Sequence, residues 1–257
     1  MTEVQKKTTV TVGPLTLGTG IPKLCIPVVG ATEVTFLANL HAAIQAEPDL
    51  IELRIDTLHQ GDPEEVLRQA AKAASDIPLL LTCRSQRDGG EGSPETYADL
   101  LFHLLHLNPG FSLIDLEISA GEPVFTRLRQ AATDRGIPVI GSWHSFSGTP
   151  DADEILRRYT CIEAWGASVA KVALMTHCAE DVDRLCSCAR QASALLRIPL
   201  IAISMGPLGA RTRTDCEQIG SCMTFASAGT ESAPGQMPAA AVREALRKRH
   251  DKLTEKG

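Results

Sequence analysis

Aromatic residues are scarce in this sequence, in which Phe, Tyr and Trp together make up only 4% of 257 residues. The hydrophobic content is nevertheless 44%, so we expect a core built from Leu, Ile, Val and Ala. A chain of this length and apolar content often forms one large α/β barrel rather than two domains. We therefore expect residues 1–257 to form a single domain.

The chain also lacks an excess of positive charge and any long apolar run. Its formal net charge is −6, whereas binding to nucleic acid requires concentrated Lys and Arg, so we expect no nucleic-acid partner. A small anionic substrate remains compatible if a few arginines gather at one site. The first thirty residues show no signal-peptide pattern, and no run is long enough to span a bilayer. We therefore expect a cytoplasmic protein without a membrane partner.

Patterns typical of metal or disulfide sites are missing as well. The eight cysteines include no CxxC pair, and Cys25, Cys83 and Cys222 fall in apolar strand-like runs, where a thiol behaves as a small hydrophobic group. His103 and His106 are three apart on a predicted helix with no third ligand nearby, which indicates surface histidines. No GxGxxG follows the first predicted strand. We expect reduced cysteines and no metal.

Short apolar runs alternate with longer helical stretches, as in parallel βαβ units. The predicted strands are Lys23–Val29, Leu50–Ile55, Pro78–Arg84, Ser112–Ile118, Ile137–Trp143, Ser168–Leu174, Ile198–Ser204 and Ser221–Ala226. The predicted helices are Glu33–Ala46, Pro63–Ala74, Pro94–Leu107, Pro123–Asp134, Ala152–Trp165, Glu180–Leu196 and Pro238–Lys252. Residues 1–20 read as an N-terminal β-hairpin. Strand number favours an α/β fold of the (β/α)8 TIM barrel type with the hairpin closing the bottom, although an open doubly wound sheet is compatible.

Lys171 is a single cation among apolar residues of a predicted strand. Burial costs an ammonium its hydration and drives it toward the neutral amine, which attacks carbonyl groups to form imines. A lysine that extends to solvent, or one in a structural ion pair, fits this residue equally well. The neighbouring strands must therefore decide between these interpretations.

Five consecutive predicted strands place ionisable side chains on one face near their carboxyl ends, because residues two apart share a face. These inward-facing polar residues are Glu52, Arg54, Asp56, Thr82, Arg84, Asp115, Glu117, Ser142, His144 and Lys171. Each alone could be structural, but catalytic groups of such barrels converge at this end. Residues 229–236 are small and polar, which fits either a solvent loop or a lid that offers Ser232 and Gln236 to a substrate.

In their order and spacing these motifs closely resemble those of the type I 3-dehydroquinate dehydratases, the Schiff-base enzymes of the shikimate pathway. The resemblance covers nearly the whole chain. The matching motifs are Glu52-Leu-Arg54-Ile-Asp56, Thr82-Cys-Arg84-Ser85, Gly89-Gly90-Glu91, Asp115-Leu-Glu117, Ser142-Trp-His144-Ser-Phe146, Lys171-Val-Ala-Leu-Met175, Ser204-Met205-Gly206 and Ser232-Ala-Pro-Gly-Gln236.

The resemblance implies a homodimeric lyase that dehydrates 3-dehydroquinate to 3-dehydroshikimate without a metal or organic cofactor. Lys171 would form an imine with the ring ketone, and His144, oriented by Asp88, would act as general acid and base. The residues that would bind the substrate are Glu52, Arg54, Arg84, Met205, Arg213, Ser232 and Gln236. Among these, Arg213 would bind the carboxylate.

The sequence departs from the family at four positions. Asp88 stands where Glu is typical, Ser145 where Asp is frequent, Arg211 where the residue is usually apolar, and Cys216 where Gly is usual. Two alternatives stay open at this point. One is a different imine-forming barrel, such as an aldolase or transaldolase, and the other is a catalytically silent barrel used for binding or regulation.

Overall fold

Eight parallel strands form a closed barrel in the structure, a computed structural model that describes residues 7–229 and 232–255. The strands are β3 (Lys23–Val28), β4 (Leu50–Arg54), β5 (Leu79–Thr82), β6 (Leu113–Glu117), β7 (Val139–Ser145), β8 (Val169–Met175), β9 (Leu200–Met205) and β10 (Met223–Phe225). They pair in the order β10-β3-β4-β5-β6-β7-β8-β9. The ring is completed where Leu200 pairs with Ser221, beside a 2.8 Å hydrogen bond from the Cys222 N–H to the Leu200 carbonyl. The predicted (β/α)8 barrel is thus confirmed, and the open doubly wound sheet is wrong.

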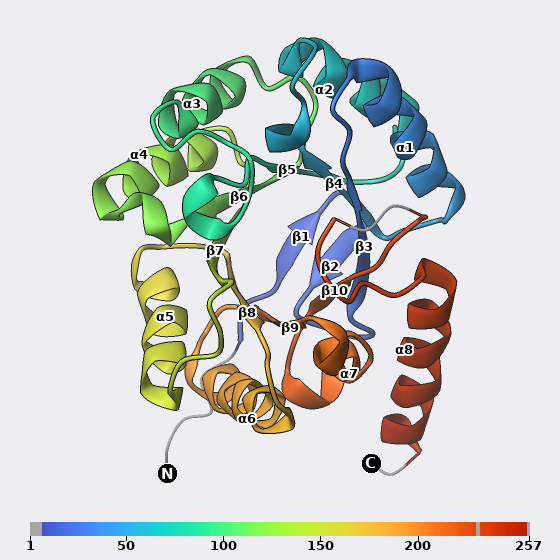
Figure 1. Cartoon of the computed structure of the whole chain (residues 1–257), viewed down its shortest axis with the longest axis vertical. Helices are drawn as coiled ribbons and strands as arrows, with labels where there is room; N and C mark the ends of the chain where they lie inside the picture. The colour runs from blue at the N-terminus through green and yellow to red at the C-terminus, as the bar shows by residue number, and fades with distance from the viewer. Residues whose placement is uncertain (1–6, 230–231, 256–257) are drawn as a thin grey trace.

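Helices surround this barrel (Figure 1). They are α1 (Glu33–Gln45), α2 (Pro63–Ala73), α3 (Tyr97–Leu107), α4 (Glu122–Thr133), α5 (Ala152–Ala164), α6 (Ala179–Leu195), the short α7 (Ala210–Thr214) and α8 (Ala239–Thr254). The prediction that α3 begins at Pro94 is wrong by three residues, because Ser93 accepts a hydrogen bond from the Glu95 N–H and residues 94–96 form a turn. In the part of the chain that the structure describes, no helix combines the length and apolarity needed to cross a membrane.

The N-terminal hairpin closes the lower end of the barrel. Its strands β1 (Val10–Val12) and β2 (Leu15–Leu17) pair antiparallel, and Figure 1 shows them through the centre of the barrel. Val10, Val12 and Leu17 are buried in one cluster with the inward residues at the beginnings of the barrel strands. This confirms the predicted hairpin for its described part; residues 1–6 lie outside the described residues.

The alternation of side chains along the strands gives the barrel interior an apolar floor and a polar upper layer. Leu50, Leu80, Leu113, Ile140 and Val169 belong to the buried floor cluster. Two residues further along the same strands come Glu52, Thr82, Asp115, Ser142 and Lys171, all of which are buried. Since side chains two apart share a face, five inward positions in one layer carry polar groups. Glu52 and Lys171 of this layer line the cavity at the carboxyl ends of the strands.

Candidate active site

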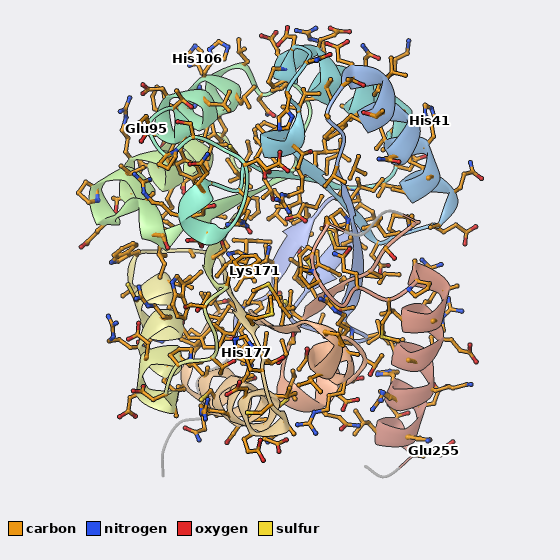
Figure 2. All side chains as sticks on the ribbon, in the orientation of Figure 1. His41, Glu95, His106, Lys171, His177 and Glu255 are labelled. Carbon is orange, nitrogen blue, oxygen red and sulfur yellow. The ribbon has the colours of Figure 1, made fainter. Side chains whose placement is uncertain are left out.

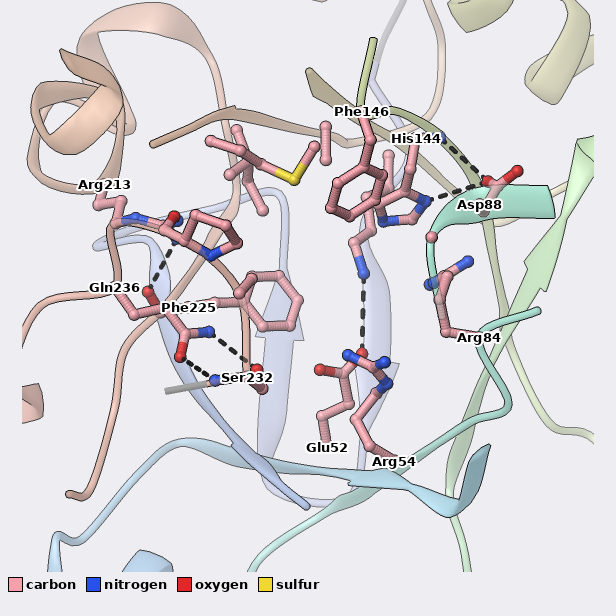
Figure 3. Close-up of a pocket in the computed structure, with 17 residues that line it drawn as sticks. Glu52, Arg54, Arg84, Asp88, His144, Phe146, Arg213, Phe225, Ser232 and Gln236 are labelled. Atoms are coloured by element: carbon pink, nitrogen blue, oxygen red, sulfur yellow. Dashed lines mark hydrogen bonds and ion pairs between the residues drawn. The ribbon is translucent and has the colours of Figure 1, made fainter. Parts of the chain in front are cut away.

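A cavity of about 250 Å³ lies at the carboxyl ends of the barrel strands. The structure brings all ten predicted site residues to its wall: Glu52, Arg54, Arg84, Asp88, His144, Lys171, Met205, Arg213, Ser232 and Gln236. Figure 3 shows His144 and Asp88 on one side of the cavity, and Arg213, Ser232 and Gln236 on the other. Among the described residues, no group of three or more His, Cys, Asp or Glu side chains is arranged to hold a metal ion.

Lys171 lies near the centre of the molecule, whereas His106 lies at its periphery (Figure 2). The lysine is only 4% exposed, so it does not extend to solvent. Its Nζ donates a hydrogen bond to Oδ2 of Asp115 at 3.0 Å and lies 3.7 Å from Oε1 of Glu52. The nitrogen also lies 4.6 Å from the centre of the Phe225 ring. Two carboxylates therefore lie within ion-pair distance of the lysine nitrogen.

Arg84 crosses the polar layer and joins two buried carboxylates. Its Nη2 donates to Oδ1 of Asp115 at 2.8 Å, and its Nη1 donates to Oε1 of Glu117 at 3.0 Å. Burial opposes ionisation of Asp115, but the positive charges of Arg84 and Lys171 outweigh it and lower the Asp115 pKa. For Glu117 burial prevails over Arg84, and its pKa is raised. Arg84 lines the cavity, but these hydrogen bonds make it part of the framework below.

His144 is held by Asp88 through two contacts to one carboxylate oxygen. Oδ2 of Asp88 accepts from the His144 backbone N–H at 3.0 Å and lies 3.1 Å from the ring Nδ1. This contact assigns the proton of the neutral ring to Nδ1 and leaves Nε2 as an acceptor. Burial and the positive charge of Arg84 lower the His144 pKa to about 4, against the opposing effect of Asp88. The shorter Asp in place of the usual Glu thus still reaches the histidine.

The turn that carries Asp88 is fixed by close packing. Asp88 ends η2 (Gln86–Asp88), and Gly89 follows with a φ of +76°. The positive φ favours glycine at this position, and a Cβ here would lie 2.2 Å from the Phe146 ring, which would have to move. Phe146 is 42% exposed and lines the cavity. The turn at Gly89-Gly90 therefore places Asp88 next to the Phe146 ring in the wall of the cavity.

Arg54 is oriented by Asp56 at the edge of the cavity. Its Nε and Nη2 donate to the two carboxylate oxygens of Asp56 at 2.8 and 2.7 Å. Asp56 is buried, and the hydrogen bonds and charge of Arg54 lower its pKa although burial acts in the other direction. Nearby, Glu52 accepts a hydrogen bond from the Thr82 hydroxyl at 2.9 Å. These bonds fix the two polar residues of β4 that face the cavity.

The segment of residues 232–236 covers one side of the cavity and is tied internally. The Ser232 backbone N–H donates to Oε1 of Gln236 at 2.9 Å, and Nε2 of Gln236 donates to the Ser232 hydroxyl at 3.1 Å. Arg213 donates to the carbonyls of Gly235 at 2.9 Å and Pro234 at 3.1 Å. In the structure this guanidinium, which we expected to bind a substrate carboxylate, holds the backbone of the segment 232–236.

The unusual residues beside Arg213 have structural partners. The Cys216 thiol is buried and donates to the Arg213 carbonyl at 3.0 Å, which supports the backbone of this loop. Arg211 forms an ion pair with Asp183 on α6. Neither replacement removes Arg213 from the cavity.

Sequence reasoning left out several residues of the site. Asp115 was recognised as inward-facing, but nothing in the sequence indicated that it contacts Lys171. Phe225 and Ile203 form an apolar wall of the cavity. The alternation along their strands is the signal that could have identified them.

Comparison with known proteins agrees with this geometry. Residues 24–252 match the family model described as type I 3-dehydroquinase. The 3-dehydroquinate dehydratase of Geobacillus sp. (strain WCH70) is 37% identical over 231 residues, which are 88% of this chain and 89% of that protein. The one from Albidiferax ferrireducens is 38% identical over 228 residues, 86% of each chain.

Two solved structures are similar over nearly the whole chain. The crystal structure of a type I 3-dehydroquinate dehydratase from Clostridium difficile, with covalent modified comenic acid, has a TM-score of 0.90 at 30% identity and covers 96% of this chain and 99% of its own. The enzyme from Geobacillus kaustophilus has a TM-score of 0.89 at 32% identity, covering 95% and 96%. Sequence, fold and cavity agree: the chain belongs to the type I 3-dehydroquinase family.

Proposed function

We propose that this protein is a hydro-lyase that dehydrates 3-dehydroquinate to 3-dehydroshikimate through an imine on Lys171. The observation that carries the proposal is the buried Lys171 nitrogen at the cavity, together with a histidine whose Nδ1 is held by Asp88. The dehydratases to which the chain is similar, at 37% and 38% identity, support the substrate and the reaction.

The reaction uses the lysine as nucleophile and the histidine as base and acid. The neutral Lys171 amine adds to the ring ketone, and loss of water leaves a protonated imine. The cationic nitrogen draws electrons from the adjacent C–H bond, and Nε2 of His144 takes that proton. His144 then returns the proton to the hydroxyl that departs as water. A further water molecule hydrolyses the imine, which releases the product and restores the lysine.

The remaining cavity residues would bind the ring. The cavity has a volume of about 250 Å³, just below the roughly 300–1,000 Å³ of pockets that bind drug-sized ligands. This size suits a small ring acid. Arg213 would bind the carboxylate, with Met205 beside it, while Glu52, Arg54 and Arg84 face the ring. Ser232 and Gln236 would exchange their mutual hydrogen bonds for bonds to substrate oxygens when the lid closes.

Borohydride trapping tests substrate and nucleophile together. Borohydride added with 3-dehydroquinate should reduce the imine to a stable amine, and peptide mass mapping should place the adduct on Lys171. The Lys171→Ala variant should form no adduct and show no turnover above background, measured by the absorbance of the conjugated product. An unmodified wild-type protein during turnover would refute the mechanism. Product analysis separates this reaction from that of an aldolase or transaldolase.

We also propose that the protein acts in the cytoplasm as a single-domain homodimer without a cofactor. The homodimer follows from the family resemblance. Sedimentation velocity at several concentrations tests the dimer, and activity retained after treatment with a chelator and desalting tests the cofactor proposal.

A further inference from the structure

We propose that Asp115 is a catalytic residue, the fixed counter-ion of the cationic imine that forms on Lys171. The inference rests on the proposed function, because it concerns the state of the nitrogen during that reaction. Asp115 was not among the residues to which the sequence gave a role. It contacts the reacting atom directly, through the 3.0 Å bond between Oδ2 and Nζ of Lys171.

Two carboxylates approach the lysine, and Asp115 is the nearer and the more enclosed. Oε1 of Glu52 lies 3.7 Å from Nζ and already accepts the hydrogen bond of Thr82. The side chain of Asp115 has no exposure, whereas that of Glu52 is 5% exposed and borders the cavity. Because water screens a buried pair least, the interaction of Lys171 with Asp115 is the stronger of the two.

The orientation of the carboxylate is set from its other side. Oδ1 of Asp115 accepts from Nη2 of Arg84 at 2.8 Å and from the Ser142 hydroxyl at 2.5 Å. Arg84 is itself anchored to Glu117 at 3.0 Å. Rotation of the carboxylate would break both bonds to Oδ1, so Oδ2 stays directed at the lysine nitrogen. The site therefore offers a preorganised anion that needs no rearrangement during the reaction.

The charge balance of imine formation explains why Asp115 can act as counter-ion both before and after the imine forms. The lysine ammonium and the ketone give a protonated imine and water, so the nitrogen carries a positive charge before and after the step. Nε2 of His144 takes one proton from the ammonium, so that the neutral amine adds to the ketone, and returns it to the carbinolamine hydroxyl, which leaves as water. The N–H that remains on the imine can donate to Oδ2 of Asp115. Since the Asp115 pKa is lowered, Asp115 remains an anion and does not carry the proton.

The consequence concerns the acidity of the neighbouring C–H bond. Only the protonated imine withdraws electrons strongly enough for His144 to remove that proton readily. Without the Asp115 charge, the imine should lose its own proton at lower pH. An opposite charge at this distance shifts a pKa by about one to three units, so the alkaline limb of kcat should move down by this amount.

The test compares three proteins, the wild type, Asp115→Asn and Glu52→Gln, by borohydride trapping and by the pH profile of kcat. We expect Asp115→Asn to form the Lys171 adduct at about pH 6, while its kcat at about pH 8 falls about 100-fold and its alkaline limb moves down. Glu52→Gln, which removes the more distant carboxylate, should move the limb less. An unshifted limb in Asp115→Asn, or a larger shift in Glu52→Gln, would overturn the proposal.

The same measurements separate the two hypotheses. A wild-type protein without adduct refutes the imine and the counter-ion together, whereas a trapped wild type with an unshifted Asp115→Asn profile refutes the counter-ion alone. If Asp115→Asn fails to fold, which thermal unfolding will show, Ser142→Ala takes its place. That variant keeps the carboxylate but loses the 2.5 Å bond to Oδ1, so its alkaline limb should move down measurably, by up to about one unit. An unmoved limb in Ser142→Ala would then count against the proposal.

Discussion

His144 should make the stability of this protein depend on pH in a direction that the structure determines. Burial and the positive charge of Arg84 lower the pKa of the imidazole from its ordinary 6.5 to about 4, in spite of Asp88. The unfolded chain therefore binds a proton at this residue from about pH 6.5 downward, whereas the folded chain does so only near pH 4. Because the unfolded state binds more protons in that interval, acid favours unfolding.

The size of the effect follows from the two pKa values. One pKa unit corresponds to about 1.36 kcal/mol, so His144 alone should lower the free energy of unfolding by about 3 kcal/mol between pH 6.5 and pH 4. Its contribution is fully present above pH 6.5, declines through the interval and levels off below pH 4. The side chain is only 9% exposed, so little screening by water reduces this value.

The measurement pairs wild type with His144→Gln, which cannot titrate in this range. Urea unfolding from about pH 7 to about pH 4 should show the wild type losing about 3 kcal/mol more than the variant. Histidine NMR spectra of the wild type, assigned by comparison with the variant, give the pKa directly. A His144 resonance that titrates at or above pH 6.5, or a wild-type-minus-variant difference that does not change with pH, would refute the reasoning.

Three further outcomes are expected. In Gly235→Ala the new Cβ would lie 2.4 Å from the Gly206 carbonyl oxygen, at a backbone φ of +76°. The lid should therefore be displaced, and KM should rise about 10-fold with a smaller change in kcat. An unchanged KM would contradict this. Asp56→Asn removes the charge that orients Arg54. Steady-state kinetics should show KM raised about 10-fold, and thermal scans should show a lower unfolding midpoint. Unaltered values of both would speak against the role of this pair. Asp88→Asn keeps a hydrogen-bond acceptor for His144 but removes the negative charge of the carboxylate. We expect kcat to fall about 10- to 100-fold with little change in KM. A wild-type kcat would exclude Asp88 from orienting the base.

The period-two pattern made the barrel and much of its polar layer predictable from sequence. Glu52, Arg54 and His144 all reach the cavity as the alternation of side chains required. Strand boundaries shifted by one or two residues without changing which face each side chain occupies. The end of a helix depends on weaker local effects, and the turn before α3 illustrates this, since the Ser93 hydroxyl accepts the Glu95 N–H there instead of the chain continuing as a helix from Pro94.

Contacts between strands could not be read from the same pattern. The pairing of Lys171 with Asp115 joins β8 to β6, two strands that are not neighbours in the sheet, across the inside of the barrel. It depends on strand tilt and on the rotamer that Arg84 imposes, and a linear sequence contains neither. For the same reason, Arg213 was expected at the substrate carboxylate alone, whereas its hydrogen bonds to Pro234 and Gly235 emerge only from the folded loop.

The hairpin formed by β1 and β2 closes the floor of the barrel, and residues of the segment 232–236 line the cavity above it. In the proposed reaction, imine formation and dehydration each release a water molecule, and imine hydrolysis consumes one. With the lower end of the barrel closed by the hairpin, water, substrate and product would all pass through the end of the barrel where the strands have their carboxyl ends. A ligand bound at that end would block release of the product as well as entry of the substrate.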